Sequence, residues 1–230
     1  MNLLHMVTSA PDRTPTFTMF GNPDYFNQVA TKAQGHGQDC SNVNFPACVV
    51  ESPAFAWNHG DVQQDITRTW FGMVGPGVRQ TGRNDDVFSD HTDLRPTIMT
   101  LLGLTDDYVT DGRVLIEFIQ PHGSAAAMHS HEFISLAQVY KQINAPVGPL
   151  GLAALKYANT AITSNDPAAY GSYLNNIAGI TSTRNNLAAQ MISLLNDAAF
   201  AGRPVNGAQA NSLVNQGNQL ISTVQGLAGP

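Results

Sequence analysis

A histidine in the sequence Asn58-His59-Gly60-Asp61 is the residue best suited to chemistry in this chain. A neutral imidazole is a good zinc ligand, and a following glycine lets the loop pass close to an ion. Asn58 and Asp61 could orient a metal-bound ring or line a pocket, because such rings usually donate their other N–H to an oxygen. Capping of an Asx-type turn accounts for both flanking residues equally well. A lone histidine is usually structural or exposed, and spacing alone favours that interpretation for His59.

The elements around His59 predict part of a parallel sheet. Residues 16–20 (TFTMF) and 69–74 (TWFGMV) are short apolar runs bounded by glycine and proline, which is typical of buried strands. Residues 55–57 could form another strand that ends just before His59. Open α/β sheets bind ligands at the carboxyl ends of their strands, so His59 is expected at that edge. Residues 93–104 predict a helix, with a capping residue, a proline in the first turn and a terminal glycine.

The stretch AWNHGDVQQDITRTWFGMVGPGVRQTGRNDDVFSDHTDLRPTIMTLLGL resembles the end of the catalytic domain in the alkaline phosphatase superfamily, near its type I phosphodiesterase and nucleotide pyrophosphatase branch. In that family a loop histidine precedes a strand ending in Gly-Pro, and a helix of the form DLxPTxxxLLGL follows. The loop histidine is the last ligand of a two-metal site. The resemblance therefore implies that His59 coordinates a divalent metal, with zinc as the best fit. It covers about residues 1–120, and PDRTPTFTMFGNPDYF extends it upstream.

Other histidines are weaker candidates for metal binding. Asp90-His91 is similar to a ligand pair of the superfamily, but it follows His59 and runs straight into the predicted helix. We expect it to start that helix, with Thr92 or Asp93 as the cap and Arg95 paired locally. His129 and His131 could chelate a metal from one strand face, but they come just before a helix and are expected to be exposed to solvent.

The motifs that complete catalysis in the superfamily do not occur in this sequence. They are a Thr or Ser nucleophile, an early Asp ligand, an Asp with a nearby His, and an Asp-His pair, all held by the N-terminal half of the sheet. Two-metal phosphoryl transfer needs both ions, and a single histidine cannot hold them. The resemblance implies that the missing N-terminal half is the intramolecular partner of this chain. We expect no catalytic residue here.

The second half of the chain predicts helices, over residues 131–143, 150–162, 167–200 and 208–227. The last two carry facing apolar stripes, as in an antiparallel pair. The predicted fold class is α/β, a partial alkaline-phosphatase-like sheet segment followed by an all-α C-terminal helical hairpin or small bundle. The predicted division is residues 1–120 for the α/β part, 121–147 for a connecting segment with a helix, and 148–230 for the helical part.

The composition and the two cysteines limit the partners and the cellular compartment of the protein. A net charge of −6 with 12% charged residues offers no basic surface for nucleic acid. No segment is long and apolar enough to span a membrane. Cys40 and Cys48 lie in a polar, loop-like stretch and fit a local disulfide, which indicates an oxidising compartment. We expect a secreted or extracellular protein whose signal lies upstream, because the first residues lack the apolar region of a signal peptide.

The sequence thus predicts the C-terminal fragment of a secreted, metal-dependent phosphoester hydrolase of the phosphodiesterase or nucleotide pyrophosphatase type, inactive alone. Its substrate would be a phosphoester small molecule. The alternatives are a non-catalytic interaction module that presents the C-terminal helices, and a sulfatase or phosphomutase branch of the same superfamily.

Overall fold

The computed structural model describes residues 1–21, 59 and 61–229. The fold is all-helical, with about 59% of residues in helices and no sheet within the described part. Contacts divide the chain into two units, Met1–Pro15 with Met73–Pro230, and Thr16–Gly72. The prediction of an α/β sheet segment is therefore wrong.

The segments predicted as strands are extended or irregular, and they are exposed. The side chains of Phe17 and Met19 are 66% and 74% exposed, and that of Trp70 is 90% exposed. A strand exists only when another strand satisfies its backbone groups, and among the described residues one isolated antiparallel bridge occurs, between Val78 and Ile119. Short apolar runs do not specify such a partner. The strand predicted at 55–57 lies outside the described residues.

Four long helices form the bundle that makes up most of the larger unit: α3 (His131–Asn144), α4 (Pro149–Thr163), α5 (Pro167–Phe200) and α6 (Gly207–Ala228). Their bounds confirm the predicted helices to within about two residues. Local capping explains this agreement. The side chains of Ser130, Asp166 and Asn206 accept backbone N–H bonds at the starts of α3, α5 and α6.

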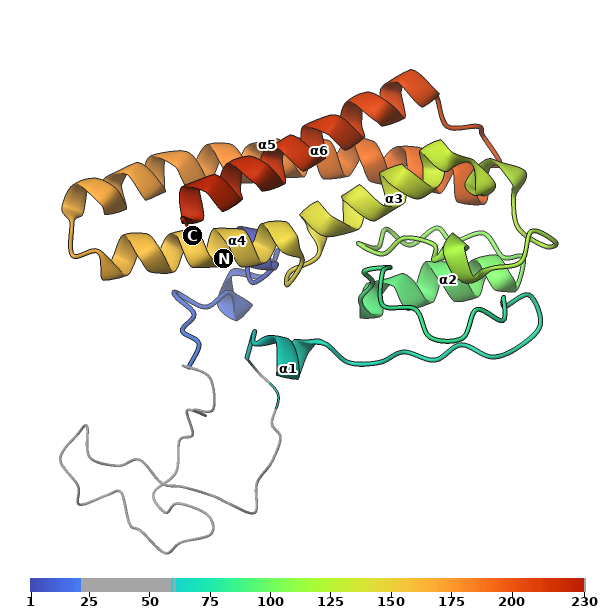
Figure 1. The fold of residues 1–230 in the computed structure, drawn as a ribbon, viewed down its shortest axis with the longest axis horizontal. Coiled ribbons are helices and arrows are strands. Elements are labelled where there is room, and N and C mark those ends of the chain that lie inside the picture. Colours follow the sequence, from blue (N-terminus) through green and yellow to red (C-terminus); the bar gives the residue numbers. More distant parts are fainter. Residues whose placement is uncertain (22–58, 60, 230) are drawn as a thin grey trace, which may run out of the picture. The chain divides into compact units, whose positions relative to one another are not determined.

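The bundle has a simple order (Figure 1). Helices α3 and α4 follow one another along one side, α5 runs back along both of them, and α6 returns beside α5. The 34 residues of α5 span about 51 Å, enough to cover the two shorter helices. The break between α3 and α4 contains Pro146, which cannot continue the first helix, and α4 begins at Pro149, because proline fits the first turn of a helix. Side chains from all four helices form one apolar core, including Phe133, Leu150, Met191 and Val224.

The remaining elements are short. They are the helix α1 (Gln64–Thr67), the helix α2 (Leu94–Leu101), and the 3-10 turns η1 (Asn2–Leu4), η2 (Pro11–Arg13), η4 (His91–Asp93), η5 (Ile116–Phe118) and η6 (Ala126–His129). Helix α2 lies within the predicted range 93–104 and confirms a helix there. The chain turns out of α2 at Gly103, which has a φ of 65°, a conformation that glycine adopts readily.

Candidate functional site

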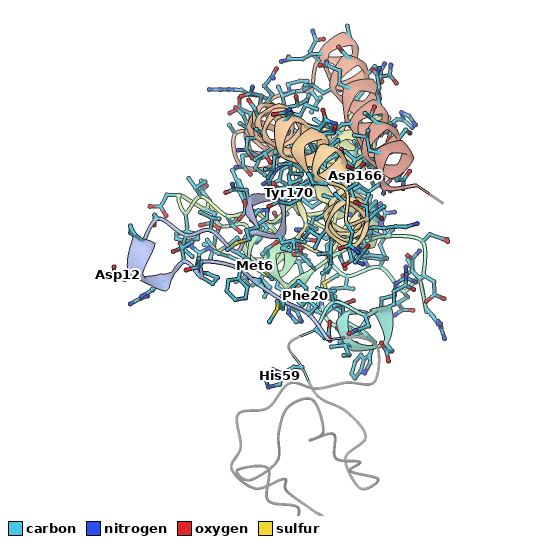
Figure 2. The ribbon with its side chains drawn as sticks, turned by 90° about the vertical axis from the view of Figure 1, so that its left-hand side faces the viewer. Met6, Asp12, Phe20, His59, Asp166 and Tyr170 are labelled. Atoms are coloured by element: carbon cyan, nitrogen blue, oxygen red, sulfur yellow. The ribbon has the colours of Figure 1, made fainter. Side chains whose placement is uncertain are left out.

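The residues predicted to bind metal or form a disulfide are only partly described. His59 is exposed (Figure 2). Asp61 is half-buried, and its Oδ1 accepts the backbone N–H of Val62 at 2.7 Å, the local bond expected of a turn-capping aspartate. Asn58, Cys40 and Cys48 lie outside the described residues. Among the residues that the structure describes, no group of three or more His, Cys, Asp or Glu side chains could hold a metal ion.

The start of α2 forms the most developed polar cluster of the larger unit. Asp90 is the cap of η4: its carboxylate accepts the Thr92 N–H at 2.9 Å, and Asp93 accepts the Asp90 N–H at 3.1 Å. This reciprocal pattern satisfies donors that the first helical turn leaves without partners. Arg95 pairs with Asp106 at 2.7 Å. Both observations confirm that Asp90-His91 starts a helix, with local pairing of Arg95, but the capping side chain is that of Asp90 and not the predicted Thr92 or Asp93.

Lys141 on α3 reaches into this cluster and is buried, with 1% of its side chain exposed. Its ammonium lies 2.9 Å from the carboxylates of both Asp90 and Asp93. It also donates to the Thr92 hydroxyl at 2.7 Å and to the Asp111 carbonyl at 3.3 Å. The three protons of the ammonium are therefore fully used by oxygen acceptors.

Burial and the Lys141 charge act in opposite directions on the two carboxylates. Asp93 is fully buried, and this burial raises its pKa although Lys141 and the Arg113 N–H oppose the shift. Burial also favours the neutral form of Asp90, but the Lys141 charge and the bonds from Thr92 outweigh it. The pKa of Asp90 is lowered as a result. Asp93 is thus the partner that depends most on Lys141 to stay ionised.

A second layer of bonds ties the Asp111 loop to the bundle. The hydroxyl of Tyr140 donates to the Asp111 carbonyl at 3.1 Å, and the Asn144 amide donates to the Asp111 carboxylate at 3.3 Å. Arg184 on α5 donates to the Asn144 side-chain oxygen at 2.9 Å. Gly112 is needed beside this loop, because any Cβ there would collide with the backbone carbonyl of Thr92.

The cluster joins α2 to the bundle and is well suited to holding α2 in position. It leaves Lys141 no free proton with which to bind a ligand. Sequence reasoning missed Lys141, although a signal was present: it lies four residues after buried Ala137 and eight after buried Phe133, on the stripe that faces the core. A lysine at such a position requires buried acidic partners.

Comparisons with protein-family models, curated proteins and solved structures found no match for this chain. In the described part of the chain, no helix is long and apolar enough to cross a bilayer.

Proposed function

We propose that the chain is the C-terminal part of a secreted, metal-dependent phosphoester hydrolase of the phosphodiesterase or nucleotide pyrophosphatase type, and that alone it is inactive toward phosphoesters. Its bundle holds α2 in place so that α2 can pack against the catalytic half. The observation that carries this proposal is the apolar surface on the helix whose sequence, DLRPTIMTLLGL, resembles the family pattern.

This surface, the α2 outer face, consists of Ile98, Leu102 and Leu104 on α2 and the turn after it. Their side chains are 51%, 65% and 51% exposed. The opposite side of α2 is buried, with Thr97 and Thr100 facing the rest of the unit. A helix that is apolar on its solvent side as well as packed on its inner side is typical of a protein contact.

The polar cluster supports the same proposal. The ion pairs of Lys141 with Asp90 and Asp93 fix the first turn of α2 against α3. The α2 outer face therefore lies on a helix whose position is fixed by the bundle. Within the proposed enzyme, His59 supplies one metal ligand, with zinc as the ion, and Asn58 and Asp61 lie beside it. The remaining ligands and the nucleophile belong to the catalytic half.

Zinc titration calorimetry on the purified chain, with an assay on bis(4-nitrophenyl) phosphate, tests this proposal. We expect weak zinc binding that is lost in His59→Ala and kept in His122→Ala, a matched control at another exposed histidine. We expect no turnover. Turnover that His59→Ala abolishes would show a complete active site, and zinc binding that survives His59→Ala would remove the ligand role.

A second candidate is an interaction module that presents the C-terminal helices. The end of α4 and the start of α5, on either side of the turn that joins them, carry three exposed apolar or aromatic side chains, those of Ile162, Tyr170 and Leu174. Tyr170 stacks on Tyr173 with ring centres 6.1 Å apart, and Figure 2 shows Tyr170 near Asp166 at this end of the bundle. If Ile162→Ser and Leu174→Ser abolish binding of a protein partner that Leu102→Ser leaves intact, this candidate is favoured over the α2 outer face.

A further inference from the structure

A cavity of about 490 Å³ lies between the start of α3 and the segment before it. It is lined by Arg79, Ile116, Glu117, Pro121, Ser124, Ala126, His129 and Ile134. The lining residue Arg79 follows the bridge between Val78 and Ile119, and its backbone N–H donates to the Phe118 carbonyl at 2.8 Å. Its volume is within the usual range of small-molecule sites.

Two of the lining side chains, those of Ser124 and His129, pair a nucleophile with a base. The Ser124 Oγ lies 2.7 Å from the His129 Nε2, and both residues are half-buried. The sequence predicts an exposed His129, whereas the structure has it half-buried against Ser124. The other acceptor within reach of the Ser124 hydroxyl is the Gln120 carbonyl, at a longer 3.3 Å. In the tautomer that carries its proton on Nδ1, the His129 ring accepts the Ser124 hydroxyl proton at Nε2.

The surroundings keep the imidazole able to accept that proton. Burial and the positive charge of Arg79 lower the pKa of His129, which favours the neutral form of the ring. A neutral histidine within hydrogen-bond distance of a serine is the arrangement that activates a hydroxyl. Glu117 lines the same cavity, but its carboxylate is held by Arg113 at 2.8 Å and by Gln138 at 3.3 Å. The arrangement is thus a Ser–His pair without a third acidic member.

The positive charge of Arg79 indicates that the ligand is negatively charged. Its Nε donates to the Ile119 carbonyl at 2.7 Å, which fixes the side chain beside the cavity. Its guanidinium suits a carboxylate. Ile116, Pro121 and Ile134 provide an apolar wall for a short carbon chain.

We propose that Ser124 and His129 form an acyl-transfer site for short carboxylic esters that carry a second, negatively charged carboxylate. The Ser124 oxygen attacks the ester carbonyl carbon while its proton passes to His129 Nε2. The C–O bond to the alcohol breaks, and the alcohol leaves with that proton. Water then attacks the acyl-serine, restores the serine and releases the acid. Arg79 binds the second carboxylate.

Labelling of the full chain with a neutral alkyl fluorophosphonate tests the nucleophile. The serine oxygen would bond to phosphorus, fluoride would leave, and the proton would pass to His129. We expect one adduct by intact mass, mapped to Ser124 by peptide mass. Ser124→Ala should lose it, and His129→Gln should slow labelling by about 100-fold because it removes the general base. Ser222→Ala, at an exposed serine on α6, and His122→Gln, at an exposed histidine next to the lining residue Pro121, should label like the parent.

Hydrolysis of mono(4-nitrophenyl) succinate against 4-nitrophenyl acetate tests the ligand class. The parent should prefer the succinate, and Arg79→Gln should lose that preference while still being labelled at Ser124. No adduct on the folded parent, or an adduct elsewhere than Ser124, would overturn the proposal, as would equal labelling of His129→Gln. The parent's adduct site and His129→Gln decide the question even if Ser124→Ala fails to fold, which circular dichroism would reveal.

Discussion

The bundle α3–α6 and the segment from Asp90 to Ile119 belong to one unit but are stabilised differently. In the bundle, backbone groups are satisfied within each helix, and apolar side chains such as Leu136, Leu150 and Met191 fill the interior. Between Asp90 and Ile119, regular structure is brief, and polar side chains complete the backbone hydrogen bonds.

Several hydrogen bonds show how polar side chains stabilise the segment from Asp90 to Ile119. The Asp93 carboxylate accepts the Arg113 N–H at 2.9 Å, and the Thr97 hydroxyl accepts the Leu115 N–H at 3.0 Å. Arg113 itself is 1% exposed and donates to the Val114 carbonyl and to Glu117. A buried backbone group without a partner costs free energy, so a segment without regular helices or sheets must bury polar side chains to satisfy it. The comparison predicts that substitutions that remove a buried charge destabilise the segment from Asp90 to Ile119. Substitutions that change side-chain volume should destabilise the bundle.

The largest expected effect is from Lys141→Met, which leaves buried Asp93 without its cation. We expect a loss of about 3–5 kcal/mol in the free energy of unfolding at pH 7, the usual range for breaking a buried ion pair. The loss should shrink as the pH falls, because Asp93 can then become neutral. Urea unfolding measures it, with Lys156→Met at an exposed lysine as the control. A loss as small as that of the control would show that the cluster does not stabilise α2.

A side chain added at Gly217 on α6 tests how closely the helices of the bundle are packed. A Cβ there would lie 2.5 Å from Val139 Cγ1 and 3.3 Å from Met191 Cε. Overpacking typically costs about 1–3 kcal/mol, partly offset by the better helix propensity of alanine. We expect Gly217→Ala to be destabilised in urea unfolding. Gly179→Ala, on α5 with open space around it, should gain about 0.5–1 kcal/mol. Equal gains at both positions would mean that the helices can separate without cost.

The smallest expected effect concerns acid stability through Asp111. Its contact with His5 lowers the pKa of Asp111 to about 2, against the effect of burial and with help from Asn144. Because this pKa lies below the unfolded value of about 3.9, the stabilisation is complete above that pH and is lost as the pH falls toward 2. Asp111→Asn should therefore show a shallower loss of unfolding free energy between pH 4 and pH 2. The side chain is largely exposed, so solvent screening keeps the difference small. Urea midpoints at pH 4, 3 and 2 measure it, and equal slopes would contradict it.

Prediction from sequence succeeded where the signals are local. Asp166-Pro167 starts α5 and Gly202-Arg203-Pro204 follows its end, as the capping pattern indicated. It failed at residues 16–20 and 69–74, because a strand needs a partner that the sequence does not name. The roles of His59 and of the Cys40 and Cys48 pair stay predictions.

The sequence by itself determined the helices of the bundle and the start of α2, since caps, prolines and apolar spacing act within a few residues. Only the tertiary structure placed Lys141 beside Thr92, 49 residues away, and Arg184 beside Asn144, 40 residues away. It also brought the His129 ring to within 2.7 Å of the Ser124 hydroxyl. Such contacts depend on how the helices pack, and a buried charge becomes favourable only when that packing supplies its partner.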